Sequence, residues 1–274
     1  QKGLTTDVIH KFQEIICDYY NRSGRNFPFR EMISPYYVLV SEIMLQQTQT
    51  SRVSKKFLEF IKKFPDFKAL EEASLEEVLK MWKGLGYNRR AKALNKIASL
   101  VMEKFNGKLP ETVEELKEFP QIGHNTASSI VAFAFNKPTY FVETNIRRVY
   151  IYFFFPGRDD VHDKEIMILL KKTIDKSNPR EWYYALMDYG VMLKKTHPEL
   201  NKRSKHYRKQ KKFKGSSRQL RGKVLELLIR ESPQTEKELI EKLDFSSEKI
   251  KKILKQLEKE GFLTKNQNKV FIGE

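Results

Sequence analysis

Residues 109–135 read LPETVEELKEFPQIGHNTASSIVAFAF, and this stretch decides the fold. Thr112 and Glu115 have capping-box spacing, so a helix is expected to begin there. The segment FPQIG at residues 119–123 ends that helix, and a second helix rich in small residues begins near Asn125. Together they predict a helix-hairpin-helix, in which backbone N–H groups at the start of the second helix bind a DNA phosphate. An ordinary helical turn is the alternative interpretation of this stretch alone.

Helical periodicity extends outward from this stretch, from residue 4 to about residue 194. Apolar residues recur at spacings of three and four, as in Val8, Phe12 and Ile15. Helix starts are also readable, because Ser34 precedes Pro35 and Ser74 stands three residues before Glu77. We therefore expect an all-α region of about eight or nine short helices.

The pattern changes after residue 194. A basic, polar segment ends at residues 215–217 (GSS), and three helical patterns follow. Residues 262–272 then give two apolar runs around a polar turn, which favours a winged helix-turn-helix. The sequence thus predicts three parts: an all-helical domain at 1–194, a basic connector at 195–217 and a winged-helix-like domain at 218–274.

The net charge of +17 is unevenly distributed. Residues 194–214 carry ten Lys or Arg against one Glu, whereas residues 218–274 carry thirteen against ten. A polyanionic partner, nucleic acid, is the natural inference for the connector, and a solvated linker that keeps the protein in solution is the alternative. The winged-helix-like domain, nearly balanced in charge, either binds DNA or packs against protein.

Composition excludes several other classes. No apolar stretch approaches the eighteen or so residues of a membrane span, so no membrane association is expected. The first residues lack the pattern of a secretory signal, which predicts a cytoplasmic, nucleoid-associated protein. Cys17 is the only cysteine, which excludes an internal disulfide, and its apolar neighbours Ile15 and Ile16 predict burial. The five histidines are scattered, so no metal site is predicted.

Three further segments accompany the hairpin: SEIMLQQTQ at residues 41–49, GLGYNRRA at 84–91 and ETNIRRV at 143–149. With these segments, the chain resembles the helix-hairpin-helix, endonuclease III-like DNA glycosylases over residues 25–194, and among them the MutY-type adenine glycosylases. The resemblance implies an all-α, two-lobed glycosylase domain with DNA in the cleft between the lobes, followed here by the small winged-helix domain.

The implied reaction is hydrolysis of the N-glycosidic bond of adenine mispaired with guanine or 8-oxoguanine. Adenine leaves deoxyribose poorly as an anion, so its departure needs a proton on a ring nitrogen. Glu42 is the candidate acid, because its apolar surroundings at residues 38–45 should raise its pKa. Glu143 is the candidate carboxylate that stabilises the sugar cation, although the superfamily usually places Asp there. A surface role for Glu42 and a helix-capping role for Glu143 are the alternatives.

The resemblance also implies the remaining site residues. Asn125 stands where bifunctional relatives carry a Schiff-base lysine, so a monofunctional enzyme that does not cut the strand is expected. Gln47 and Tyr87 match positions that wedge into DNA when a base is flipped out, with a core role as the alternative for Tyr87. Arg30 matches a motif beside the base pocket. The other expected substrate- or DNA-binding residues are Gln46, Thr48, Gln121, Gly123, Thr126, Asn145, Lys202, Arg203, Lys205 and Arg208.

Besides Glu143, three further departures from the family pattern are visible. The four positions of the family's iron-sulfur cluster would be Lys194, Asn201, Ser204 and Gln210, and none supplies a thiolate, so no cluster is predicted. Gln121 replaces the first glycine of the hairpin, where a non-glycine residue with ordinary dihedrals would fit. No segment resembles the domain that reads 8-oxoguanine in longer relatives, so recognition of a mispaired base is more firmly expected.

The expected partner is double-stranded DNA containing a mispaired or damaged base, bound by a monomer. Two other functions remain open on the sequence. A thymine or uracil mismatch glycosylase shares the hairpin and a glutamate, and a non-catalytic DNA-binding or regulatory protein would keep the scaffold without turnover.

Overall fold

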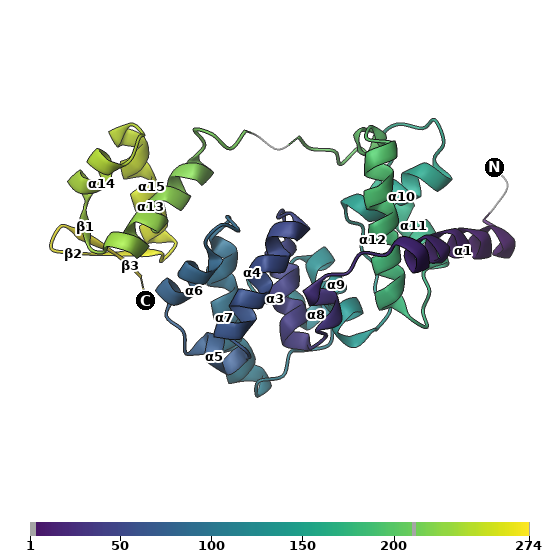
Figure 1. The fold of residues 1–274 in the computed structure, drawn as a ribbon, viewed down its shortest axis with the longest axis horizontal. Helices are drawn as coiled ribbons and strands as arrows, with labels where there is room; N and C mark the ends of the chain where they lie inside the picture. The colour runs from purple at the N-terminus through teal and green to yellow at the C-terminus, as the bar shows by residue number, and fades with distance from the viewer. Residues whose placement is uncertain (1–3, 210–211, 274) are drawn as a thin grey trace. The chain divides into compact units, whose positions relative to one another are not determined.

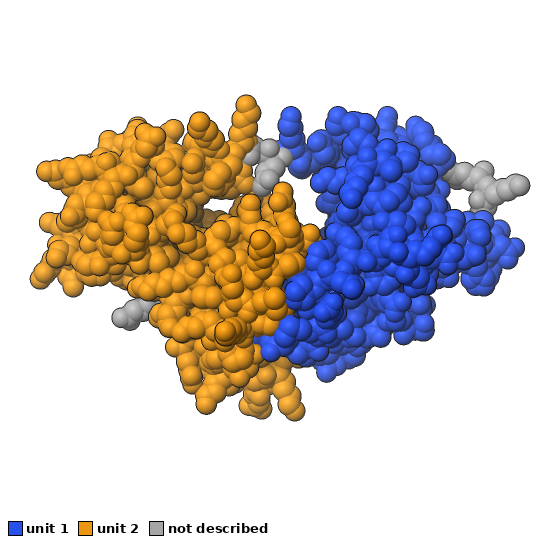
Figure 2. Space-filling view, viewed as in Figure 1, with its two compact units in different colours: residues 1–42, 110–118, 122–209 blue, residues 43–109, 119–121, 210–274 orange. Residues whose placement is uncertain are grey.

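The computed structural model describes residues 4–209 and 212–273 (Figure 1). The described residues are mainly helical, with one small sheet formed by residues 234–235, 263–266 and 269–272, which confirms the predicted fold class. The described residues form two compact units (Figure 2). Unit 1 comprises residues 4–42, 110–118 and 122–209, and unit 2 comprises residues 43–109, 119–121 and 212–273.

Unit 1 is built around aromatic side chains. Phe12 lies edge-on to both Tyr150 and Trp182, with ring centroids 5.6 and 5.8 Å apart. Each such pair contributes about 0.5–1.5 kcal/mol beyond the burial of its area. The helices of unit 1 are α1 (Thr6–Ser23), α2 (Pro28–Glu31), the start of α3 (Pro35–Leu45), α8 (Val113–Lys117), α9 (His124–Phe135), α10 (Thr144–Phe154), α11 (Asp163–Thr173) and α12 (Pro179–Thr196), followed by the 3₁₀ turn η1 (Leu200–Arg203).

The first part of unit 2 contains the end of α3 together with α4 (Thr50–Lys63), α5 (Phe67–Glu71), α6 (Leu75–Trp82) and α7 (Arg89–Phe105). Buried Arg90 determines how α3 ends. Its Nη1 donates to the carbonyl oxygens of Ile43, Met44 and Gln46 at 2.9, 2.9 and 2.6 Å. The last carbonyls of a helix have no partner within the helix, so one guanidinium here satisfies several of them.

The rest of unit 2 is the winged helix. It consists of α13 (Ser217–Glu231), β1 (Gln234–Thr235), α14 (Glu236–Lys242), α15 (Ser247–Lys259), β2 (Leu263–Asn266) and β3 (Lys269–Ile272). The strand order is β1-β3-β2, and both pairings are antiparallel. The three predicted helices and the polar turn are confirmed, whereas β1 was not predicted because two residues give no alternation to detect.

Local capping signals proved accurate. Ser34 accepts from the N–H of Tyr37 at 3.1 Å, Ser74 and Glu77 form a capping box, and Thr112 accepts from the N–H of Glu115 at 3.3 Å. The expected number of helices was too low. Twelve α-helices occupy residues 4–196, because α2, α5 and α8 are only four or five residues long and too short to show a period.

The expectation that Cys17 is buried was wrong. Cys17 is exposed, whereas Ile16 has no exposed surface. Successive residues of a helix point about 100° apart, so an apolar neighbour in the sequence need not share the buried face. Among residues 4–209 and 212–273, no helix combines the length and the apolar character that crossing a membrane requires.

Candidate active site

Glu42 lies in α3, where its neighbours Ser41 and Ile43 are buried. Ser129 of α9 places its Oγ 2.5 Å from Oε2 of Glu42 and 3.0 Å from the carbonyl oxygen of Thr126. A hydroxyl carries one hydrogen and therefore cannot donate to both oxygens. If Glu42 is protonated, the carboxyl donates to Ser129 and Ser129 donates to Thr126. The neutral acid therefore satisfies every contact of this network.

The pKa of Glu42 is raised to about 7. Burial is the main cause, because desolvation disfavours the carboxylate, and the charge of Glu143 acts in the same direction. The hydrogen bond from Ser129 and the charge of Arg30 oppose the rise. A carboxyl with this pKa is about half protonated at neutral pH, which suits a general acid.

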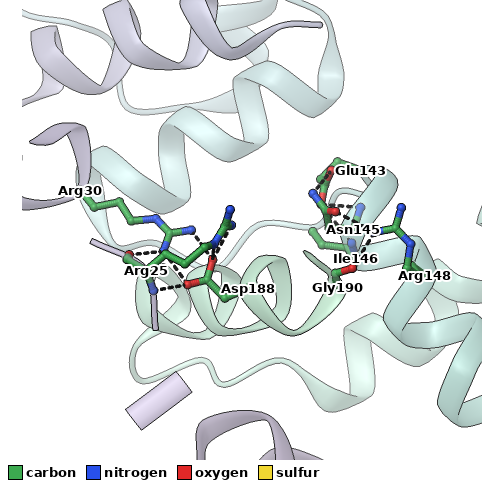
Figure 3. Close-up of polar contacts among 8 residues, drawn as sticks. All are labelled: Arg25, Arg30, Glu143, Asn145, Ile146, Arg148, Asp188 and Gly190. Carbon is green, nitrogen blue, oxygen red and sulfur yellow. Dashed lines mark hydrogen bonds and ion pairs between the residues drawn. The ribbon is translucent and has the colours of Figure 1, made fainter. Parts of the chain in front are cut away.

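Glu143 is the N-cap of α10 (Figure 3). Its Oε1 accepts from the backbone N–H groups of Asn145 and Ile146 at 2.7 and 3.0 Å, and its Oε2 accepts from Nδ2 of Asn145 at 3.3 Å. Burial raises the pKa of Glu143, while these two backbone bonds and the charges of Arg147 and Arg148 oppose the rise. The capping alternative is therefore observed, and the same cap fixes the direction of the carboxylate. The effect of Glu143 on the pKa of Glu42 puts the two carboxyls within electrostatic reach of each other.

Contacts from α12 and α9 hold the start of α10 in place. Arg148 donates to Oδ1 of Asn145 at 2.9 Å and to the carbonyl oxygen of Gly190 at 2.6 Å (Figure 3). A Cβ atom at position 190 would lie 2.4 Å from the carbonyl oxygen of Asn145, so only glycine allows α12 to approach this closely. Asn125 donates to the carbonyl oxygen of Val142 at 2.9 Å and so fixes the residue before Glu143.

Arg25, Arg30 and Asp188 form an ion-pair cluster, and the charge of Arg30 acts on the pKa of Glu42. Asp188 is 1% exposed and accepts hydrogen bonds from Arg25 at 2.6–2.9 Å and from Arg30 at 2.9 and 3.0 Å (Figure 3). Although burial raises the pKa of Asp188, the bonds and charges of Arg30 and Arg25 bring it below its ordinary value. The Arg30 guanidinium also lies 4.4 Å from the ring centroid of Tyr184. The structure thus places Arg30 as a fixed internal cation that acts on Glu42.

The expected wedge residues belong to unit 2. Gln47 and Tyr87 have φ values of 55° and 49°, in the left-handed region that the backbone of non-glycine residues rarely adopts. Gly84 and Gly86 also have positive φ values, so the turn before Tyr87 depends on glycine. Tyr87 is half-buried and Gln47 is exposed. Both residues therefore lie on a surface turn, as a wedge requires, and their role as wedges stays a prediction.

Gln46 and Thr48 connect this turn to its surroundings in unit 2. Gln46 Nε2 donates to the carbonyl oxygen of Gln121 at 3.2 Å, and Thr48 Oγ1 accepts from Arg90 at 3.0 Å. The expectation of ordinary dihedrals at Gln121 was wrong, because its φ is 63°. A left-handed conformation costs a non-glycine residue about 1–2 kcal/mol, so the turn keeps its glycine-like shape without the glycine.

The start of α9 has the features expected of a phosphate site. Gly123 is its N-cap, no side chain caps the helix, and a Cβ atom at Gly123 would meet nothing within 4 Å. A phosphate can therefore approach the backbone closely. Asn125 and Thr126 occupy the first turn of this helix, and the side chain of Asn125 bonds Val142.

Part of the connector is more ordered than the sequence indicated. Residues 200–203 form η1, Val161 pairs with Ser204, and Arg203 donates to the carbonyl oxygens of Arg158 and Phe155. Arg203 was expected to contact DNA, but its guanidinium is used inside unit 1. Lys202, Lys205 and Arg208 are all exposed, and Lys202 also forms an ion pair with Glu199 at 2.7 Å.

The positions of the family's iron-sulfur cluster have donors that do not fit it. Lys194 is exposed on α12, and Ser204 offers a hydroxyl. Asn201, with its amide nitrogen toward Thr144, donates to that carbonyl at 3.3 Å and accepts from Arg148 at 2.6 Å. Gln210 lies outside the described residues. Ammonium, amide and hydroxyl groups do not replace the thiolates that bind iron-sulfur clusters. The absence of a cluster is predicted on this chemistry, and it stays a prediction.

Four residues of this site were not foreseen from the sequence: Arg25, Ser129, Tyr184 and Asp188. Only one signal could have found any of them. Asp188 belongs to the segment MDYG at residues 187–190, which precedes the connector, and an acidic residue inside an apolar helical run needs a cation. No local sequence pattern marks Arg25, Ser129 or Tyr184.

A helix-hairpin-helix made by α8 and α9, with Glu143 as the N-cap of the next helix and Ser129 of α9 bonded to the partly buried Glu42 of α3, defines a DNA-repair type of helical scaffold. The chain belongs to the HhH-GPD superfamily of base excision DNA repair proteins, whose pattern matches residues 40–176. Residues 218–264 match the winged helix-turn-helix DNA-binding family.

Individual relatives agree with this assignment. The chain is similar to an adenine DNA glycosylase of Buchnera aphidicola, with 36% identity over 196 residues, covering 69% of this chain and 55% of the relative. It is also similar to an adenine DNA glycosylase of Mycobacterium tuberculosis, with 39% identity over 132 residues, covering 48% and 43%. A thermostable thymine-DNA glycosylase of known structure shares 25% identity with a TM-score of 0.62, covering 69% of this chain and 89% of that one. The chain spans about half the length of these curated relatives.

Proposed function

We propose that this protein is a monofunctional DNA glycosylase of base excision repair that removes adenine mispaired with guanine or 8-oxoguanine. The observation that carries the proposal is the partly buried Glu42 carboxyl, hydrogen-bonded to Ser129 and with its pKa raised to about 7, together with a second carboxylate, Glu143, that acts on it. Relatives named adenine DNA glycosylases support adenine as the base. The proposed partner is double-stranded DNA, bound by a monomer without an iron-sulfur cluster.

The reaction follows from the chemistry of the two carboxyls. Glu42 donates its proton to a ring nitrogen of the extruded adenine while the bond between the base and the sugar breaks, and the bonding electrons leave with the base. The sugar carbon becomes cationic, and the negative charge of Glu143 stabilises it. Water then adds to this carbon, and the proton that it releases restores the acid form of Glu42. The products are free adenine and an abasic site.

Asn125 explains why no strand cleavage is proposed. A strand-cutting relative uses a lysine amine to form an imine with the sugar, and an amide nitrogen is not nucleophilic enough for this. The side chain of Asn125 is instead directed to the carbonyl oxygen of Val142. The abasic product should therefore persist until alkali or another enzyme cuts it.

Thymine mispaired with guanine is the second candidate substrate, because the similar solved structure is a thymine-DNA glycosylase. The relatives that are named adenine DNA glycosylases share higher sequence identity with this chain, which favours adenine. The two bases differ in their need for acid, since a purine leaves only after ring protonation whereas thymine leaves more readily as an anion. A general acid whose pKa is raised to about 7, as that of Glu42 is, therefore fits adenine better than thymine.

One assay separates the candidates. Duplexes containing A opposite G, A opposite 8-oxoguanine, T opposite G or U opposite G are incubated with the protein and then treated with hot alkali, which cuts abasic sites. We expect cleavage of the adenine strands only, and none when alkali is omitted. Cleavage of the thymine or uracil strands instead would assign the second candidate. Tight binding without product on any duplex would show a non-catalytic DNA-binding protein.

A further inference from the structure

Unit 2 contains an open groove of about 1510 Å³ that is lined by residues of α13, of the end of α6 and of the turn between α6 and α7. Figure 1 shows where these helices lie in the chain. One wall carries Gln47, Tyr87 and Gln121, and the other carries Arg218, Gly222 and Arg230 of α13. Nine of the side chains that line it are Lys or Arg, and Glu226 is the single carboxylate among them. Such a surface favours a polyanion.

The two walls are held together by Glu260. Its carboxylate accepts from Arg89 at 2.5 and 2.9 Å and from Arg221 at 2.6 and 3.2 Å. The hydrogen bond from Arg89 is the main reason that the pKa of Glu260 falls to about 2. Lys92 of α7 donates to the carbonyl oxygens of Glu260 and Gly261 at 2.7 and 2.5 Å. The groove is therefore built into unit 2 by specific contacts.

Arg218 connects the winged helix directly to Tyr87. Its Nη1 donates to the Tyr87 hydroxyl at 2.5 Å, and its guanidinium carbon lies 5.5 Å from the centroid of the Tyr87 ring. A planar guanidinium can hold an aromatic ring and still present donors to a phosphate or a base edge. The first residues of α13 thus help to hold the turn that presents Tyr87.

Gly222 is an independent sign of a close approach. It lies inside α13, where glycine destabilises a helix relative to alanine. No neighbour among residues 4–209 and 212–273 requires it, because an added Cβ atom would meet none of their atoms within 4 Å. The missing side chain opens the middle of the groove wall instead. A glycine at such a place is typical of a backbone that approaches another molecule closely.

We propose that this groove binds the DNA strand opposite the extruded base, with α13 as one wall and Arg218 holding Tyr87 against the unpaired nucleotide. The proposal rests on the proposed function in one respect, which is that a base is flipped out. A side chain that fills the resulting gap stacks beside the partner base that stays behind. Because Tyr87 lines the groove, the strand with that unpaired base is the one that the groove meets.

The first test measures binding of the full chain to a fluorescent duplex with A opposite G. We expect Gly222→Leu to weaken binding about tenfold or more, since the added side chain fills the path of the strand. Gly222→Ala should bind within about twofold of the wild type, because it adds one methyl group and favours the helix. Melting of each variant checks that the winged helix is folded. Wild-type binding by folded Gly222→Leu would overturn the proposal and leave the groove to a protein partner.

The second test identifies the strand. Single phosphates near the mismatch are replaced by neutral methylphosphonates, first on the strand opposite adenine and then on the adenine strand. We expect replacements on the opposite strand to weaken wild-type binding severalfold and to weaken Arg218→Ala binding much less. Lys237→Ala, which removes an exposed charge from α14, should respond like the wild type. The same coupling on the adenine strand, or on neither strand, would contradict the proposal.

These measurements record binding and not excision. Failure of the proposed function would appear as intact binding with no abasic product from any duplex. Failure of the groove proposal would appear in a protein that still excises adenine. In that case, neutral phosphates on the opposite strand would weaken the binding of the wild type and of Arg218→Ala equally.

Discussion

Replacing Glu42 with Gln is expected to abolish adenine excision while DNA binding stays nearly unchanged. A glutamine amide has almost the same shape and can donate an N–H to Ser129 as the neutral acid does, but it has no proton acidic enough to transfer to adenine. General acid catalysis contributes typically 10²–10⁴-fold, so the single-turnover rate constant should fall by about 10³-fold or more.

The measurement is single-turnover excision from a duplex with A opposite G, with the dissociation constant of the same duplex determined in parallel. Glu14→Gln is a matched control, since it makes the same chemical change at an exposed position of unit 1. The control should excise at the wild-type rate. An active Glu42→Gln variant would remove Glu42 from the role of acid, and lost binding would show that the residue supports the fold.

Replacing Asp188 with Ala is expected to destabilise unit 1 severely. Asp188 is 1% exposed and accepts five hydrogen bonds from Arg25 and Arg30. The side chain of Arg30 is only 8% exposed, so the substitution leaves a guanidinium buried without its counter-ion. Breaking a buried ion pair on one side costs about 3–5 kcal/mol, and the partial exposure of Arg25 places the expected loss toward the lower end.

The chain offers a convenient reporter for this loss. It has two tryptophans, Trp182 in unit 1 and Trp82 in unit 2, so a Trp82→Phe background leaves Trp182 to follow the unfolding of unit 1 in denaturant. Asp188→Asn, which keeps the shape and some hydrogen bonds, should lose less stability than Asp188→Ala. An Asp188→Ala variant within about 1 kcal/mol of the wild type would show that the cluster is not needed for folding.

Features encoded within a few residues could be predicted from the sequence. The caps at Ser34, Ser74 and Thr112 are three-residue patterns, and the hairpin is a single short turn, so each is complete in one segment. The turn before Tyr87 was also recognisable, because Gly84 and Gly86 mark positive φ values directly. The winged helix followed from three amphipathic runs and a polar turn.

Features that depend on distant pairs could not be predicted in this way. Asp188 meets Arg25 across 163 positions, and Ser129 meets Glu42 across 87. No local pattern specifies such a partner, because many side chains of the right type are available in the sequence. The same reason explains the connector, where charge suggested a DNA contact while Arg203 has backbone carbonyls from a distant segment as its partners.

The conformation of Gln121 illustrates a different limit. The residue type predicts ordinary dihedrals, but the hairpin requires a left-handed residue at that point and φ is 63°. Tertiary contacts, including the hydrogen bond from Gln46 to its carbonyl oxygen, fix the conformation against the local preference.

The pH dependence of wild-type excision tests most directly whether position 42 acts in its protonated form. Its pKa of about 7 means that the acid form predominates below this pH and is lost above it. The single-turnover rate constant on a duplex with A opposite G, measured from pH 6 to 9, should therefore bend near pH 7 and then fall about tenfold per pH unit. A rate constant that is level or rises between pH 7 and 9 would contradict proton donation by this carboxyl.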